Sequence, residues 1–282
     1  MYKFQPILKT MVWGTENWVL SGVPGSESVV AEGPDAGRKI SEIYPGGFPL
    51  LIKFIDARDD LSIQVHPNDE LAAVRHGCKG KTEMWYVIGA DEGAHLLSGL
   101  KEKIDPEKYV ELVEKGTIVD VLDRYEVSAG DVFFLPAGRI HAIGGGCHIA
   151  EIQQTSDITY RIYDYGRPGL DGKPRQLHTQ EAKDAIDYSV LPDYRTPYKP
   201  CRGKNVELVK CPFFTTSLLD LEDTYEQKLD DCGDFLIVIC LEGSGEINGT
   251  DIAPGEAVLL PASDYVAVIS PRWHMKLLTT HV

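Results

Sequence analysis

The sequence predicts a mainly β protein built from two related β units, with small helical inserts. The 282 residues include 27 Gly and 17 Pro, and the short segments between these turn residues are rich in Val, Ile, Tyr and Phe. The pattern Gly-x5-Pro occurs at 130–136 and again at 255–261, which indicates an internal duplication. The predicted divisions are 1–170 for a first unit with N-terminal strands and a helical insert, 171–204 for a linker with a helix, and 205–282 for a second unit without metal ligands.

The composition excludes several classes of function. Twenty-eight basic and 43 acidic residues leave a formal charge of −15, which repels nucleic acid and anionic membranes, so an anionic substrate needs a local basic cluster. No stretch of 18 apolar residues occurs, and the N-terminus has no long apolar region. The six cysteines form no Cys-x-x-Cys pair and are expected to be reduced thiols. We expect a soluble, cytoplasmic protein that binds neither nucleic acid nor membrane.

Three helices interrupt the β pattern. Asn68 is placed to cap a short helix over residues 70–75, because its side-chain oxygen accepts from the free N–H groups of a first turn. Asp105 as N-cap and Pro106 at the first position predict a second helix that ends at about Gly116. A third helix is predicted from about 179 to 188.

Two strand segments carry side chains that bind metals. Successive strand side chains point to opposite faces, so Gln64 and His66 share one face of their strand, and Lys81 and Glu83 share one face of another. His141 opens a later strand. One amide oxygen, one carboxylate and two imidazoles suit a borderline divalent ion such as Zn²⁺, with open positions for water or substrate. For each residue alone, an ordinary half-buried histidine or a surface carboxylate is the better interpretation.

The setting of His141 favours the metal interpretation. Residues 130–141 have the form Gly-x5-Pro-x-Gly-x2-His: a turn glycine, a buried strand, a Pro-x-Gly turn and a histidine that begins the next strand. This form resembles the second motif of the cupin superfamily. Gln64-x-His66 with the later Glu83 resembles the first motif, with glutamine in place of a histidine.

Within that superfamily, the chain is similar to the short bacterial form of type I mannose-6-phosphate isomerase. The similarity runs from about residue 3 to the C-terminus and is densest over 49–166. The segments that carry it are Pro49–Ala57, Leu61–Asp69, Gly80–Tyr86, Pro136–Ala142 and Glu151–Tyr165. The resemblance implies two cupin-type jelly-roll barrels, of which the first binds the metal.

The resemblance also implies a chemistry. It predicts a zinc-dependent aldose–ketose isomerase that interconverts mannose 6-phosphate and fructose 6-phosphate through an enediolate. The small-molecule sugar phosphate would be bound by a monomer or homodimer with one Zn²⁺ per chain. The family assigns Gln64, His66, Glu83 and His141 as ligands.

The catalytic residues follow in part from the same resemblance. Arg161 matches the family's catalytic position, and as a group that stays protonated it is expected to fix the substrate or stabilise the enediolate. Lys81 is a candidate acid or base or a group that holds the phosphate, and Glu151 is a further candidate base. For both of them a structural ion pair is an equally good interpretation.

Three questions stay open at this level. Trp13-Gly14 runs almost directly into Glu16-Asn17-Trp18, so an insert that the family usually carries there is missing, which leaves the sugar specificity open. Another metal-dependent cupin enzyme, such as an Fe²⁺ dioxygenase, is a first alternative. A non-catalytic sugar-binding or regulatory cupin is a second.

Overall fold

The computed structural model describes residues 1–282, which divide into two compact units. We call Leu8–Asn17 with Leu51–Arg195 the site unit, and Met1–Ile7, Trp18–Leu50 and Thr196–Val282 the C-terminal unit. The N-terminal segments 1–7 and 18–50, which the sequence divisions place in the first unit, therefore cluster with the C-terminal segment. The long strand β3 (Gly14–Ser21) passes from one unit into the other.

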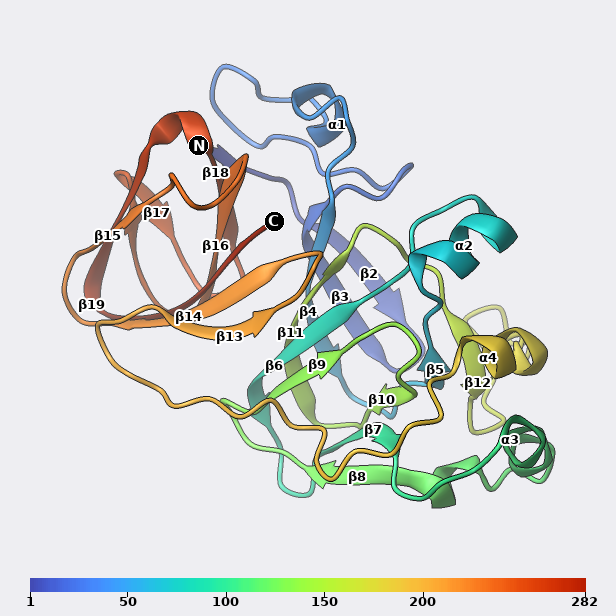
Figure 1. Ribbon diagram of the computed structural model, residues 1–282. Helices are drawn as coiled ribbons and strands as arrows, with labels where there is room; N and C mark the ends of the chain where they lie inside the picture. The colour runs from blue at the N-terminus through green and yellow to red at the C-terminus, as the bar shows by residue number, and fades with distance from the viewer. The chain divides into compact units, whose positions relative to one another are not determined.

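The site unit is built on two antiparallel sheets (Figure 1). The five-stranded sheet has the order β12 (Tyr160–Tyr163), β5 (Ile63–Val65), β10 (His141–Ile143), β7 (His95–Leu100) and β8 (Leu122–Glu126). The six-stranded sheet has the order β2 (Ile7–Met11), β3, β4 (Leu50–Ala57), β11 (Cys147–Gln154), β6 (Glu83–Ala90) and β9 (Val132–Leu135). This confirms the predicted mainly β, cupin-type fold class, although the strands form two sheets and not one closed barrel.

The space between the two sheets is apolar along most of its length. Its core includes Ile55, Val87 and Ile149 from the six-stranded sheet, and Leu96 and Ile143 from the five-stranded sheet, all buried. Because side chains alternate along a strand, the inward positions continue along β4, β6 and β11 at every second residue. Those positions change from apolar to charged at one end of the sheet, and this change defines the candidate site.

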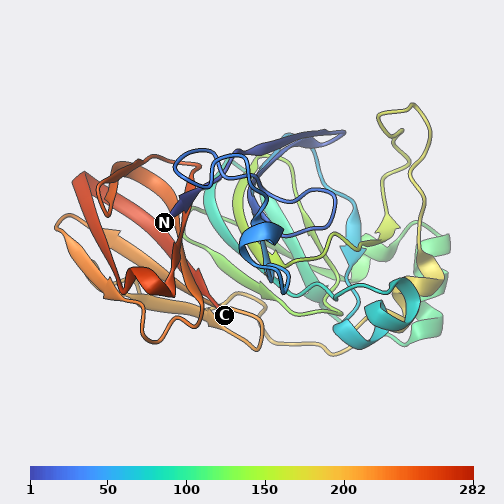
Figure 2. The same ribbon diagram turned by 90° about the horizontal axis from the view of Figure 1, so that it is seen from above.

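The outer face of the five-stranded sheet is covered by helices. Ile63 and Val65 of β5 pack there with Tyr109 of α3 and Ala182 of α4. The helices are α2 (Asp69–His76), α3 (Pro106–Glu114), η1 (Ile118–Val121) and α4 (Thr179–Ala185), and both views show α2, α3 and α4 gathered at the same end of the site unit (Figures 1 and 2). No helix has the length and apolar character needed to cross a membrane.

The helix predictions are confirmed in position. Asn68 accepts from the Leu71 N–H at 2.9 Å, and Asp105 accepts from the Lys108 N–H at 2.7 Å, as expected for N-caps. The third helix ends at Ala185 and not near residue 188, because the backbone of Ile186 is already extended, with ψ 133°.

The C-terminal unit contains an eight-stranded sheet. Its order is β1 (Tyr2–Lys3), β18 (Ala257–Pro261), β16 (Phe235–Ile247), β19 (Val266–His281), β14 (Thr215–Leu221) and β13 (Val206–Lys210), while β15 (Tyr225–Lys228) pairs with β19 and β17 (Thr250–Ile252) pairs with β16. The short helices α1 (Ile40–Ile43) and η2 (Ala262–Asp264) belong to the same unit. The two Gly-x5-Pro segments begin in similar turns: Gly130 and Gly255 both adopt positive φ, at 95° and 83°, shortly before β9 and β18.

Candidate active site and metal centre

Backbone hydrogen bonds bring the three sequence motifs together. The carbonyl of His66 accepts from the N–H of Gly138 at 2.9 Å, and the carbonyl of Pro67 accepts from the N–H of Lys81 at 3.1 Å. The turn after β5 therefore contacts both the segment that leads into β6 and the Pro-x-Gly turn before β10. These contacts explain why residues 75 positions apart in sequence, such as His66 and His141, share one site.

Glycine is required where two of these segments cross. A Cβ on Gly80 would lie 2.4 Å from the carbonyl carbon of Asn68 and 2.5 Å from the nitrogen of Asp69. Any side chain at this position would push the segment of Lys81 and Glu83 away from the turn that carries His66. Gly80 is thus a structural requirement of the site.

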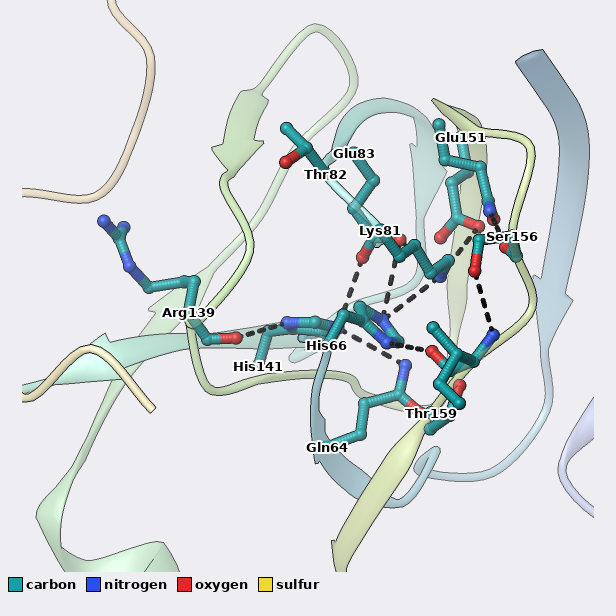
Figure 3. A network of polar contacts seen from close by, with 12 residues as sticks. Gln64, His66, Lys81, Thr82, Glu83, Arg139, His141, Glu151, Ser156 and Thr159 are labelled. Carbon is teal, nitrogen blue, oxygen red and sulfur yellow. Dashed lines mark hydrogen bonds and ion pairs between the residues drawn. The ribbon is translucent and has the colours of Figure 1, made fainter. Parts of the chain in front are cut away.

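His66, Glu83 and His141 form the only group of three or more metal-binding side chains in the chain. One ligand atom from each lies within 4.8 Å of the others, and all three residues are buried. Glu83 Oε2 lies 3.7 Å from His66 Nε2, and Glu83 Oε1 lies 3.2 Å from His141 Nε2. The predicted meeting of these residues is present in the structure (Figure 3).

The backbone orients both imidazoles toward this point. The Nδ1 of His66 lies 2.8 Å from the carbonyl oxygen of Ile158, and the Nδ1 of His141 lies 2.8 Å from the carbonyl oxygen of Arg139. A carbonyl only accepts, so each Nδ1 carries the proton and each Nε2 presents a lone pair. Burial lowers the pKa of both imidazoles, and the nearby Lys81 charge adds to this effect. Both rings are therefore neutral, the form that binds metals.

Gln64 reaches the same point from β5. Its amide nitrogen lies 3.3 Å from His141 Nε2, and its Cα is paired with that of His141 across the sheet. A half-turn of the amide exchanges its nitrogen and oxygen at this place. Gln64 thus lies where the fourth predicted ligand is needed.

Lys81 lies between the donor residues Glu83 and His66 and the neighbouring Glu151. Its Nζ lies 2.5 Å from Glu83 Oε2, 3.1 Å from His66 Nε2 and 3.6 Å from Glu151 Oε1. In Figure 3 its amine lies on the Glu151 side of Glu83 and His66, with dashed lines to His66 and Glu151. A positive charge is therefore accommodated at the place where these donors converge.

Glu151 is held by two lysines and a tryptophan. Its Oε1 lies 3.0 Å from Lys53 Nζ, and its Oε2 accepts from Trp85 Nε1 at 2.8 Å. Burial alone would raise the pKa of Glu151, but the charges of Lys53 and Lys81 outweigh burial and lower it. In contrast, burial and the negative charge of Glu151 raise the pKa of Glu83. Glu151 therefore favours its ionised form, whereas Glu83 binds a proton more readily than a carboxylate in water does.

Lys53 was not predicted as a site residue. It lies on β4, at an inward position that continues from Ile55, and is buried. The signal in the sequence is a single lysine within the otherwise apolar run Leu50-Leu51-Ile52-Lys53-Phe54-Ile55. A charge in such a run needs a buried partner, which here is Glu151.

Arg161 lies at the edge of the site and outside the donor cluster. Its Cα is paired with that of Gln64 across β12 and β5, so both side chains are on the same face of the sheet. Its Nη1 donates to the carbonyl of Gln176 at 3.1 Å, while its buried Nε has no hydrogen-bond partner. No ion pair or hydrogen bond joins its guanidinium to Gln64, His66, Glu83 or His141.

Comparisons with known proteins agree with this geometry. Residues 3–119 match the family model for the catalytic domain of type I phosphomannose isomerase. The chain is 32% identical to mannose-6-phosphate isomerase ManA of Bacillus subtilis, with 92% of each chain covered, and 35% identical to a mannose-6-phosphate isomerase of Streptococcus mutans, with 87% of this chain and 82% of that one covered.

Solved structures extend the likeness to the fold. The crystal structure of mannose 6-phosphate isomerase from Bacillus subtilis matches with a TM-score of 0.91 at 29% identity, covering 100% of this chain and 99% of that chain. A zinc-bound mannose 6-phosphate isomerase has the same fold, with a TM-score of 0.77 at 16% identity over 99% of this chain and 98% of that one. With relatives above 30% identity along nearly its whole length, the chain belongs to the type I phosphomannose isomerase family.

Proposed function

We propose that the protein interconverts mannose 6-phosphate and fructose 6-phosphate and that it uses one bound Zn²⁺ per chain. The relatives that support the substrate are named as isomerases of mannose 6-phosphate. The reaction moves a proton between C2 and C1 of the sugar through an enediolate, so the site must tolerate a developing oxyanion and carry a proton.

The donor set fits a zinc ion. His66 and His141 present Nε2 lone pairs and have their other ring nitrogen bonded to a carbonyl, which is the arrangement of metal-binding histidines. Both oxygens of Glu83 are buried and face the two imidazoles and the Lys81 amine, so the carboxylate lies where a cation would be held. With Gln64, these residues would hold the ion, and the ion would supply positive charge that stabilises the oxyanion of the substrate.

Lys81 is proposed as the proton carrier. It is buried and lies within 4 Å of Glu83, His66 and Glu151, so its Nζ is beside the side chains that would hold the ion. Glu151, held ionised by Lys53, would orient the Lys81 amine by attraction. This assigns the acid–base role to Lys81 and a supporting charge to Glu151.

A local basic cluster is available for the phosphoryl group. Arg161, Arg167 and Arg175 lie together around one buried carboxylate, that of Asp164, so three positive charges face one negative charge. The net charge of −15 repels an anionic substrate, so a local cluster of positive charge is needed to attract the phosphoryl group. We propose that Arg161 fixes the substrate from this side.

The buried His66–Glu83–His141 donor group carries the proposal, and a substrate panel tests it. Phosphorylated aldoses would be offered to protein of measured metal content, with ketose phosphate formation followed by a coupled assay. Turnover of mannose 6-phosphate that requires zinc is the expected result. Oxygen uptake with bound iron would instead favour a dioxygenase, and sugar binding without turnover would favour a regulatory protein.

A further inference from the structure

A closed loop follows β12 and returns to it. We call residues 164–178 the arm; it forms part of the site unit and projects as the olive loop in Figure 2. The side chain of Asp164, which is 5% exposed, closes the arm by accepting from Arg175 Nε at 2.7 Å and Nη2 at 2.6 Å, and from Arg167 Nε at 3.0 Å. A carboxylate that bonds a guanidinium at two points sets both position and orientation.

The end of the arm is bonded to Arg161. The carbonyl of Gln176, the residue after Arg175, accepts from Arg161 Nη1 at 3.1 Å. The backbone of Arg161 also exchanges hydrogen bonds with His178: the Arg161 N–H donates to His178 Nδ1 at 3.1 Å, and the His178 N–H donates to the Arg161 carbonyl at 2.7 Å. Asp164 therefore acts on Arg161 in two steps. It fixes Arg175, and the carbonyl of the next residue, Gln176, binds the guanidinium of Arg161.

Charge reinforces this dependence. Without the Asp164 carboxylate, the guanidinium groups of Arg161, Arg167 and Arg175 would face each other with no anion between them, and like charges at short range repel strongly in a partly buried place. The segment from Arg167 to Gln176 would then move away from β12, while the backbone hydrogen bonds between Arg161 and His178 remain. Arg161 would lose its Gln176 tether while it stays opposite Gln64, at the edge of the donor cluster.

We propose that Asp164 is a positioning residue for Arg161: it closes the arm so that Gln176 holds the guanidinium at the mouth of the site. This inference rests on the proposed function, because Arg161 acts on the sugar phosphate only if that reaction takes place. The side-chain partners of Asp164 are Arg167 and Arg175, outside the donor residues His66, Glu83 and His141.

A double-mutant cycle tests the inference in the zinc-loaded enzyme. We expect Asp164→Asn to lower kcat/KM about 10- to 100-fold, the range expected when a substrate-fixing group is misplaced by about 1 Å, with zinc content unchanged. In an Arg161→Ala background, the same substitution should change kcat/KM by less than about twofold, because its effect passes through Arg161. A role in general stability would lower activity by the same factor in both backgrounds and would overturn the inference.

A control and a second measurement complete the test. Asp171→Asn removes a carboxylate from the exposed tip of the same arm and should leave kcat/KM within about twofold of the parent. Cleavage by trypsin after Arg175, which is followed by Gln176, should be faster in Asp164→Asn than in Asp171→Asn, since an open arm is more accessible; equal rates would contradict the closing role. A wild-type protein without isomerase activity would refute the proposed function. If the wild-type protein is active but Asp164→Asn and Arg161→Ala lower kcat/KM independently of each other, only the role of Asp164 is refuted.

Discussion

Replacing Lys53 by methionine should destabilise the protein strongly, because it removes one partner of a buried ion pair. Lys53 is 6% exposed, and its Nζ lies 3.0 Å from Glu151 and 3.9 Å from Glu16. The substitution keeps the aliphatic volume but leaves Glu151 with the more distant Lys81, at 3.6 Å, as its cationic partner, beside the neutral Trp85 N–H. Breaking a buried pair from one side costs about 3–5 kcal/mol.

The expected size of this effect can be measured as a melting temperature. For a protein of this size, each kcal/mol corresponds to about 2–4 °C, so Lys53→Met should lower Tm by about 6–20 °C. Thermal unfolding would be followed by circular dichroism in the presence of a chelator, so that metal binding does not contribute. The double variant Lys53→Met/Glu151→Gln should recover part of the loss, because the buried charge is removed with its partner.

Two outcomes would refute this reasoning. A decrease in Tm of less than about 2 °C for Lys53→Met would show that Glu151 does not depend on Lys53 for its charge balance. A double variant less stable than Lys53→Met alone would show that the ionised form of Glu151 is favourable by itself.

Three further predictions concern the site. Arg161→Ala should lower turnover strongly with zinc content unchanged, since Arg161 is not among the donors; loss of zinc, measured by atomic emission, would show a structural role. His141→Ala and Glu83→Ala should each lose both metal and activity, and stoichiometric zinc in either variant would contradict the ligand assignment. Gly80→Ala should lower the free energy of unfolding by about 1–3 kcal/mol through overpacking, which would be measured as a lower Tm. Gly46→Ala is the control, because its added Cβ would meet nothing within 4 Å and its Tm should not change. Equal Tm values for the two variants would contradict the close crossing at Gly80.

The alternation of side chains made the donor group predictable. The pairs Gln64 with His66 and Lys81 with Glu83 follow from the two-residue period of strands, and the Pro-x-Gly turn before His141 indicated a strand start. The N-caps Asn68 and Asp105 were predictable for a similar reason, because a cap depends on neighbouring residues only. Each of these signals is local in the chain.

The charge balance of the site was not predictable in the same way. Lys53 and Trp85 contact Glu151 only because β4, β11 and β6 lie side by side, and no local pattern specifies which strands become neighbours. The arm shows the same limit: Asp164 and Arg175 are ordinary charged residues in sequence, and only the return of the chain to β12 makes them partners. The grouping of segments 1–7 and 18–50 with the C-terminal unit likewise depends on long-range contacts: β1 pairs with β18, and the rings of Tyr44 and Phe48 pack on Phe235.

The sequence by itself indicated the fold class, the helix starts and the candidate donor residues, because periodicity, capping and turn chemistry act over a few residues. The tertiary structure decided which charges neutralise one another, where Lys81 lies among the donors, and what holds Arg161. Those features depend on distances between segments far apart in the chain, and burial makes each of them strong, since water no longer screens the charges that folding brings together.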